Sequence, residues 1–149
     1  MINLSGSAVI CQPVGQVFDF LSTPENDVRW HAGTLAASTL TEGIASTGSF
    51  FRSIGHWMGR RNLSTFEVTE YKPDQKYGFK SLSGPFSSQT SYTLGAADGG
   101  CTKIEISIQA EVVSFFQMNE RILEKKMKEQ LRENLVTLKV LLETESFAG

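Results

Sequence analysis

The residues best suited to chemistry lie together in one short segment, PENDVRWHAG, from Pro24 to Gly33. Asp27 and His31 are four positions apart, a spacing at which an α-helix lets a carboxylate orient an imidazole as a general base. The same residues are also typical of a solvated helix end, with acids in the first turn and Arg29 and His31 near the C-terminus. The second interpretation needs only helix electrostatics, so we favour it.

Other candidates for chemistry are isolated. Tyr77 and Tyr92 could donate protons inside an apolar cavity, as could Ser81 or Thr90, but the pattern predicts no base beside any of them. The chain has only two histidines and two cysteines, in no metal-ligand spacing, and the glycine-rich GAADGG precedes no helix that could bind phosphate. We therefore assign no catalytic residue and expect neither a metal nor a cofactor.

The hydrophobic pattern predicts the elements that position these residues. Residues 3–11 form a strand, and two short helices follow, one over 14–22 and one that begins near Thr23 and ends at Gly33. Six segments with strand alternation and turn signals come next, at 35–40, 48–59, 60–71, 76–84, 86–94 and 101–112. Their short connections favour antiparallel pairing of consecutive strands.

A long amphipathic helix is predicted from about Phe116 to Glu145, because this stretch has no glycine or proline. Its apolar positions recur every three or four residues and form one stripe: Leu123, Met127, Leu131, Leu135, Leu138 and Leu142. A helix of that length fits one compact layer only if a curved sheet wraps around it. The opposite, charged face leaves a homodimer as an alternative use of the helix.

Composition limits the class of protein. The chain has 149 residues, a formal net charge of −2 and a pI of about 5.7, so we expect one domain over 1–149 and no nucleic-acid partner. We see neither a signal peptide nor a membrane span, so we expect a soluble cytoplasmic protein in which Cys11 and Cys101 are reduced structural thiols. Antiparallel pairing of the first and last strands is one arrangement in which the two sulfurs come close, but neither their distance nor their redox state follows from the sequence.

The order of elements resembles the helix-grip fold of the START-like, Bet v 1-like superfamily (SRPBCC), and in particular its polyketide cyclase/dehydrase and lipid-transport group. The segments QPVGQVFDFLSTPENDVRW and GSFFRSIGHWMGRRNLSTFEVTEYKPDQKYGFKSLSGPF carry the resemblance. It implies an α+β fold in which a curved, seven-stranded antiparallel sheet wraps around the C-terminal helix, with a cavity between them and Trp30 at its mouth. Fold alone does not imply an activity.

Strand alternation then predicts which side chains face the cavity. We expect Arg52 and His56 to point outward, because an unpaired charge is costly to bury. The expected ligand-binding residues are aromatic (Trp30, Phe51, Trp57, Phe66, Phe79 and Tyr92), hydroxyl-bearing (Ser81 and Thr90) or on the long helix (Leu123 and Met127). For Trp30, plain packing under the sheet is the alternative.

These residues favour a carrier or sensor of a small hydrophobic or aromatic molecule. One alternative is an enzyme similar to polyketide cyclases and dehydratases, which would act without metal on an enolisable substrate held near its reactive shape. The other is a protein-interaction module with a filled core, which would use the outer sheet face around Arg52, His56 and Arg60.

Overall fold

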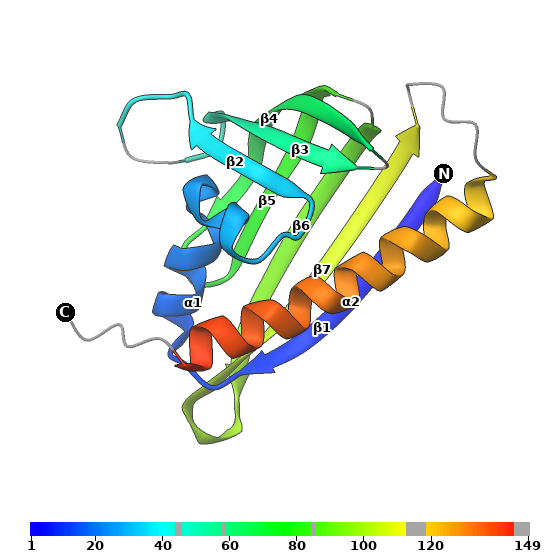
Figure 1. Ribbon diagram of the computed structural model, residues 1–149. Helices are drawn as coiled ribbons and strands as arrows, with labels where there is room; N and C mark the ends of the chain where they lie inside the picture. The colour runs from blue at the N-terminus through cyan, green and yellow to red at the C-terminus, as the bar shows by residue number, and fades with distance from the viewer. Residues whose placement is uncertain (44–45, 58, 85, 113–118, 145–149) are drawn as a thin grey trace.

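A computed structural model describes residues 1–43, 46–57, 59–84, 86–112 and 119–144. The elements follow the predicted order, and the α+β helix-grip fold is confirmed (Figure 1). They are β1 (Ile2–Ile10), α1 (Val14–Leu21), the 3₁₀ helix η1 (Pro24–Arg29), β2 (Thr34–Thr39), β3 (Phe50–Trp57), β4 (Arg60–Lys72), β5 (Lys76–Ser83), β6 (Phe86–Ala97), the 3₁₀ turn η2 (Asp98–Gly100), β7 (Cys101–Val112) and α2 (Glu120–Thr144).

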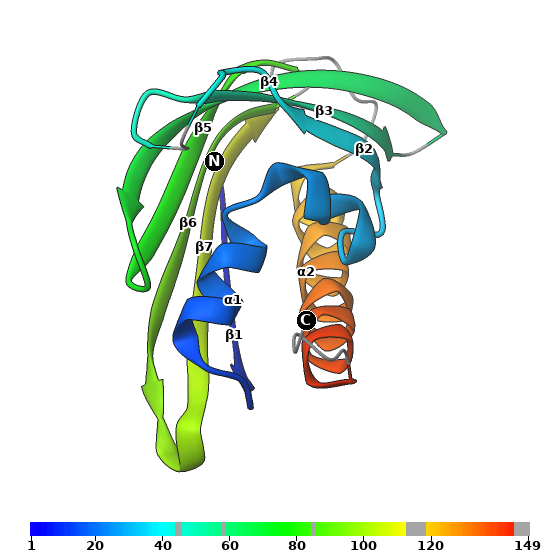
Figure 2. The same ribbon diagram turned by 90° about the vertical axis from the view of Figure 1, so that its left-hand side faces the viewer.

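The seven strands form one antiparallel sheet in the order β1-β7-β6-β5-β4-β3-β2. Alternation determines its faces: Ile104, Ile106 and Ala110 of β7 are buried, whereas Glu105 between them is exposed. The register shifts once between β2 and β3 and twice between β4 and β5, and such bulges increase local twist and bend a sheet. Figure 2 shows the result, a sheet that arches over α2 with α1 beneath it.

Helix α2 runs along the concave side of the sheet next to β1 (Figure 1). Its stripe of leucines is buried, and Gly6 of β1 lies against it: a Cβ atom on Gly6 would come within 2.8 Å of Leu135 Cδ1. The missing side chain therefore allows the helix to approach the strand closely. The helix begins at Glu120 rather than near Phe116, and residues 116–118 and 145 lie outside the described residues.

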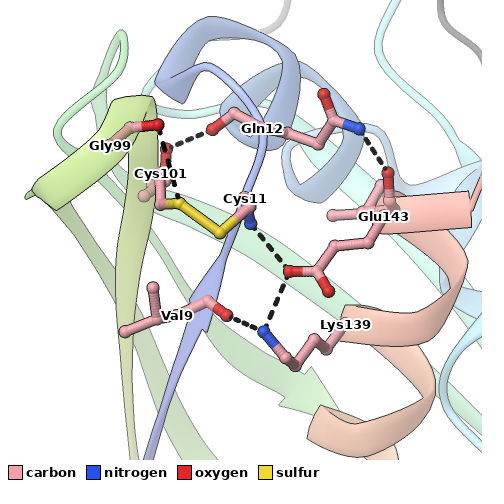
Figure 3. Close-up of a disulfide and its surroundings, with 9 residues drawn as sticks. Val9, Cys11, Gln12, Gly99, Cys101, Lys139 and Glu143 are labelled. Atoms are coloured by element: carbon pink, nitrogen blue, oxygen red, sulfur yellow. Dashed lines mark hydrogen bonds and ion pairs between the residues drawn. A yellow bond between two sulfur atoms is a disulfide. The ribbon is translucent and has the colours of Figure 1, made fainter.

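Cys11 and Cys101 form a disulfide, so the expectation of two reduced thiols is wrong (Figure 3). Antiparallel pairing places Ile10 of β1 opposite Thr102 of β7, and the next residue along each strand towards this end is a cysteine. The strand register explains why the sulfurs meet. No sequence pattern reports the oxidation state.

Around the disulfide, hydrogen bonds attach the last turns of α2 to the corner between β1 and α1 (Figure 3). The Cys11 N–H donates to the Glu143 carboxylate at 2.8 Å, and the Gln12 amide donates to the Leu142 carbonyl at 2.9 Å. Lys139 bridges Glu143, at 2.9 Å, and the Val9 carbonyl. This end of the molecule is therefore cross-linked both covalently and by hydrogen bonds.

In the part of the chain that the structure describes, no helix is both long and apolar enough to cross a membrane.

Candidate ligand-binding cavity

A cavity of about 280 Å³ lies between the sheet and α2. Its walls come from β1, the strands β4 to β7, the segment after η1, and the middle of α2: Leu4, Trp30, His31, Phe66, Phe79, Phe86, Ser88, Thr90, Tyr92, Ile106, Ile108, Met127, Gln130, Leu131 and Asn134. Most of these side chains are apolar, and none of the described wall residues carries a carboxylate, a lysine or an arginine. The volume is at the small end for ligand sites, so it suits a molecule of one or two rings.

The sheet side of the cavity is an aromatic wall centred on Phe79. Its ring lies 5.4 Å from Phe66, 5.7 Å from Tyr92 and 5.2 Å from Phe51, centroid to centroid, in edge-to-face pairs. Cross-strand pairing brings these rings together, since Phe66 and Phe51 are opposite one another in β4 and β3. Such pairs add to the energy of burial and hold each ring at a fixed angle, so the wall is preorganised.

Six of the ten residues expected to bind ligand line this cavity, namely Trp30, Phe66, Phe79, Thr90, Tyr92 and Met127. Phe51 lies behind the wall, stacked on Phe66 at 5.0 Å, and Leu123 is buried in α2 without being part of the wall. The side chain of Trp57 lies outside the described residues. His56 is exposed, as alternation predicts.

Ser81 is not part of the cavity wall, contrary to its expected role as a polar anchor. Its hydroxyl accepts a hydrogen bond from the Ser88 N–H at 2.8 Å and donates to the Phe86 carbonyl at 3.0 Å. The side chain therefore satisfies backbone groups at the start of β6. Thr90, which is buried at the cavity wall, is the expected polar anchor that remains in place.

Sequence reasoning left out two polar wall residues, Gln130 and Asn134 of α2. With Leu123 and Met127 they follow one another at spacings of four, three and four, so they continue an inward-facing row beside the leucines. That spacing was a usable signal. A stripe defined only by apolar residues could not include two amides.

The pairing of Asp27 with His31 as a carboxylate–imidazole base, the alternative that we did not favour, does not occur, because the segment is a 3₁₀ helix. With three residues per turn, Trp30 rather than His31 stacks above Asp27. The His31 N–H donates to the Asp27 backbone carbonyl at 2.8 Å, and burial alone lowers the pKa of the His31 imidazole to about 4. A carboxylate–imidazole base is therefore absent from this site in the described residues.

The favoured alternative, a solvated helix end, is also wrong for Asp27, whose side chain is buried. Burial, and secondarily the charge of Glu25, raises the pKa of Asp27 to about 8. The nearby indole N–H of Trp30 opposes this rise in pKa, yet it does not reach hydrogen-bond geometry with any partner. Asp27 is thus a neutral carboxylic acid at pH 7, held behind the cavity wall.

The tyrosine hydroxyls near Asp27 are also held in their neutral form. Burial, followed by the charge of Asp27, raises the pKa of Tyr92 well above its ordinary value, and the pKa of Tyr77 is raised for the same reasons. With neutral His31, the cavity therefore presents uncharged hydrogen-bonding groups at neutral pH.

The chain belongs to the family described as polyketide cyclase/dehydrase and lipid transport, whose model matches residues 1–143. Among solved structures, a START superfamily protein from Mycobacterium smegmatis aligns with a TM-score of 0.82 at 13% identity, over 96% of this chain and 98% of that chain. A conserved protein from Geobacillus kaustophilus aligns with a TM-score of 0.77 at 17% identity, over 95% of both chains.

The di-domain ARO/CYC BexL of the BE-7585A biosynthetic pathway aligns with a TM-score of 0.74 at 15% identity, over 98% of this chain and 48% of BexL. At these identities the likeness shows the fold alone. No curated protein matches the chain in sequence.

Proposed function

We propose that this protein is a carrier or sensor that binds a small, uncharged, mostly apolar ring compound in the cavity between the sheet and α2. The observation that supports this most directly is the cavity itself, about 280 Å³ lined by a preorganised aromatic wall and apolar helix side chains. An apolar ligand there would replace poorly hydrated space with contacts, and a few polar groups would orient it.

The protonation states favour binding over acid–base catalysis. A histidine with a pKa of about 4 is a weak base at neutral pH, and a tyrosine with a strongly raised pKa is a weak acid. Asp27, whose pKa of about 8 would suit a general acid, is not among the residues that line the cavity. A cyclase-like reaction driven by shape remains the alternative, and the size of the cavity restricts it to substrates of one or two rings.

The test uses Met127, whose methyl group can report on the cavity that it lines. We would titrate 2-methylnaphthalene into protein labelled with ¹³C at the methionine methyl groups. Saturable movement of the Met127 resonance, with little movement of Met1, is the expected result. A Met127 resonance that never moves would show that the cavity does not take such a ligand.

A matched pair of variants locates the effect. Ser88 lines the cavity, whereas Ser87, its neighbour in β6, is exposed on the outer face. Ser88→Phe should fill the cavity and abolish the titration, and Ser87→Phe should leave it unchanged. Native mass spectrometry of gently purified protein, before and after denaturation, would then identify the class of any natural ligand that leaves with unfolding.

Two further expectations remain predictions. A homodimer is tested by the molar mass of the protein in solution. Cytoplasmic location is tested by the thiol state of Cys11 and Cys101 in intact cells, because disulfides persist mainly in oxidising compartments. In an interaction module with a filled core, 2-methylnaphthalene would not move the Met127 methyl resonance, and substitution of Arg52 or His56 would abolish binding of the protein partner.

A further inference from the structure

One corner of the cavity is polar and held together by hydrogen bonds. The Ala32 N–H donates to the Asn134 amide oxygen at 3.2 Å, and the Gln130 amide donates to the same oxygen at 2.8 Å. The first bond attaches the segment that follows η1 to the middle of α2, and the second joins two side chains of α2. They place His31, Gln130 and Asn134 side by side in the cavity wall.

His31 is fixed within this corner. Its backbone N–H donates to the Asp27 backbone carbonyl at 2.8 Å and its backbone carbonyl accepts from the Thr34 N–H at 3.1 Å, while its ring packs edge-on against Trp30 with centroids 3.9 Å apart. The imidazole therefore has little freedom to turn away. A ligand must be positioned against this ring to form a hydrogen bond with it.

The ring nitrogen Nε2 of His31 is shielded from solvent and has no hydrogen-bond partner. A buried polar atom left in that condition costs about 1–3 kcal/mol, so an unfilled position of this kind calls for an explanation. The Trp30 N–H is also unpartnered, but Asp27 lies next to it. His31 is itself a residue of the cavity wall, so the cavity is the nearest space from which a partner can reach its ring, after a small shift of the side chains that now cover Nε2.

We propose that His31 is the specificity-determining residue of the cavity and that it selects an uncharged ring compound bearing a hydroxyl or carbonyl group over a hydrocarbon of the same shape. This inference rests on the proposed function and specifies its ligand. A neutral imidazole nitrogen can accept from a hydroxyl or, in its other tautomer, donate to a carbonyl. A carboxylate ligand is disfavoured, because no described wall residue carries the positive charge that it would need.

The test compares 2-naphthol with 2-methylnaphthalene, two probes of nearly equal shape that differ by a hydroxyl and a methyl group. Dissociation constants measured by calorimetry should favour 2-naphthol about tenfold in the unmodified protein, the usual worth of one hydrogen bond. His31→Phe should abolish that preference while 2-methylnaphthalene still binds. His31→Gln, which can still donate and accept, should restore part of it.

Met127→Leu is the matched control, since it changes an apolar wall residue and should affect both probes equally. A preference that survives in His31→Phe would assign the anchor to Thr90 or Ser88 and overturn the inference. Equal binding of both probes to the unmodified protein would also overturn it, while leaving the proposed function intact. If neither probe binds, the proposed function fails and this inference fails with it.

A spectroscopic measurement on the unmodified protein covers the case in which His31→Phe does not fold. The chain has two histidines, and His56 is exposed on the outer face. In a long-range ¹H–¹⁵N spectrum, 2-naphthol should move the Nε2 resonance of His31 and leave both His56 nitrogens in place. Saturable binding of 2-naphthol without movement of His31 Nε2 would contradict the proposed contact.

Discussion

The C-terminal end and the middle of helix α2 perform different tasks. In the C-terminal half, Leu138 and Leu142 are at most 1% exposed, and the adjoining corner is closed by the Cys11–Cys101 disulfide and the bonds of Lys139 and Glu143. In the middle of the helix, Met127 is only partly buried and faces the cavity with the amides of Gln130 and Asn134. One amphipathic pattern thus produces a tightly packed end and a middle that faces a cavity.

This difference shows how a small domain can keep a cavity at all. Unfilled apolar space costs stability in proportion to its volume, so other parts of the fold must compensate. Here the compensation is concentrated at the end where β1, α1 and α2 meet. We therefore expect substitutions at the packed end to change mainly the free energy of unfolding, and substitutions in the cavity-lining middle of α2 to change mainly ligand binding.

The largest expected effect comes from the disulfide, which joins residues 90 positions apart. Cross-linking a loop of that length destabilises the unfolded chain by about 4.6 kcal/mol in the chain-entropy model. Reduction, or the double change Cys11→Ser with Cys101→Ser, should lower the free energy of unfolding in urea by up to that amount. Ligand affinity should stay unchanged, because neither cysteine lines the cavity.

The double variant is its own control, since a reductant should have no effect on it. Equal stability of the oxidised and reduced protein would show that the corner is held without the cross-link. A changed affinity for 2-methylnaphthalene would show that the disulfide corner and the cavity are coupled. The division between residues that set stability and residues that set ligand binding would then be incorrect.

A pair of truncations on α2 compares its packed C-terminal end with its cavity-lining middle directly. Leu138→Ala removes a side chain that is fully buried, and such changes cost about 3 kcal/mol. Met127→Ala only enlarges an existing cavity and should cost about 1 kcal/mol, while it weakens binding of 2-methylnaphthalene. Urea denaturation of both variants measures the two losses in free energy of unfolding. Equal losses of stability would mean that Met127 is as tightly packed in solution as Leu138.

The sequence was sufficient for the fold because alternation and helical spacing recur over long segments. The strand segments, the antiparallel pairing of consecutive strands from β2 to β7 and the long helix follow from such patterns, as does the outward position of His56, whereas the place of β1 beside β7 does not. The register of β1 against β7 brings Cys11 next to Cys101. Whether the two thiols are oxidised depends on redox conditions, which residue spacing does not report.

The segment from Pro24 to His31 shows where local patterns fail. Its acids and its proline match a solvated α-helix, but packing against β2 tightens it into a 3₁₀ helix and turns Asp27 inward. Tertiary contacts decide between the two helical forms in so short a segment. The cavity depends on that choice, because the same turn directs Trp30 and His31 into its wall.

The smallest effect that we predict is a pH dependence that distinguishes Asp27 from His31. The pKa of Asp27 is about 8 in the folded chain and 3.8 ordinarily, so the folded chain retains a proton that the unfolded chain has released. Its contribution to stability is lost as the pH rises towards 8, by about 1.4 kcal/mol per pH unit. The pKa of His31 is about 4 in the folded chain and 6.5 ordinarily, so its contribution has the opposite slope between those values.

The two slopes oppose each other between about pH 4 and 6.5, and only that of Asp27 remains between 6.5 and 8. Stability should therefore fall by about 1 kcal/mol over that upper interval, because the slope of Asp27 flattens as the pH approaches its pKa. Asp27→Asn should remove the fall, whereas Asp98→Asn, the same change at an exposed site, should leave it in place. Urea denaturation at several pH values measures both. A fall of equal size in Asp27→Asn would mean that Asp27 is solvated in solution, and the 3₁₀ turn that holds the cavity wall would then need another explanation.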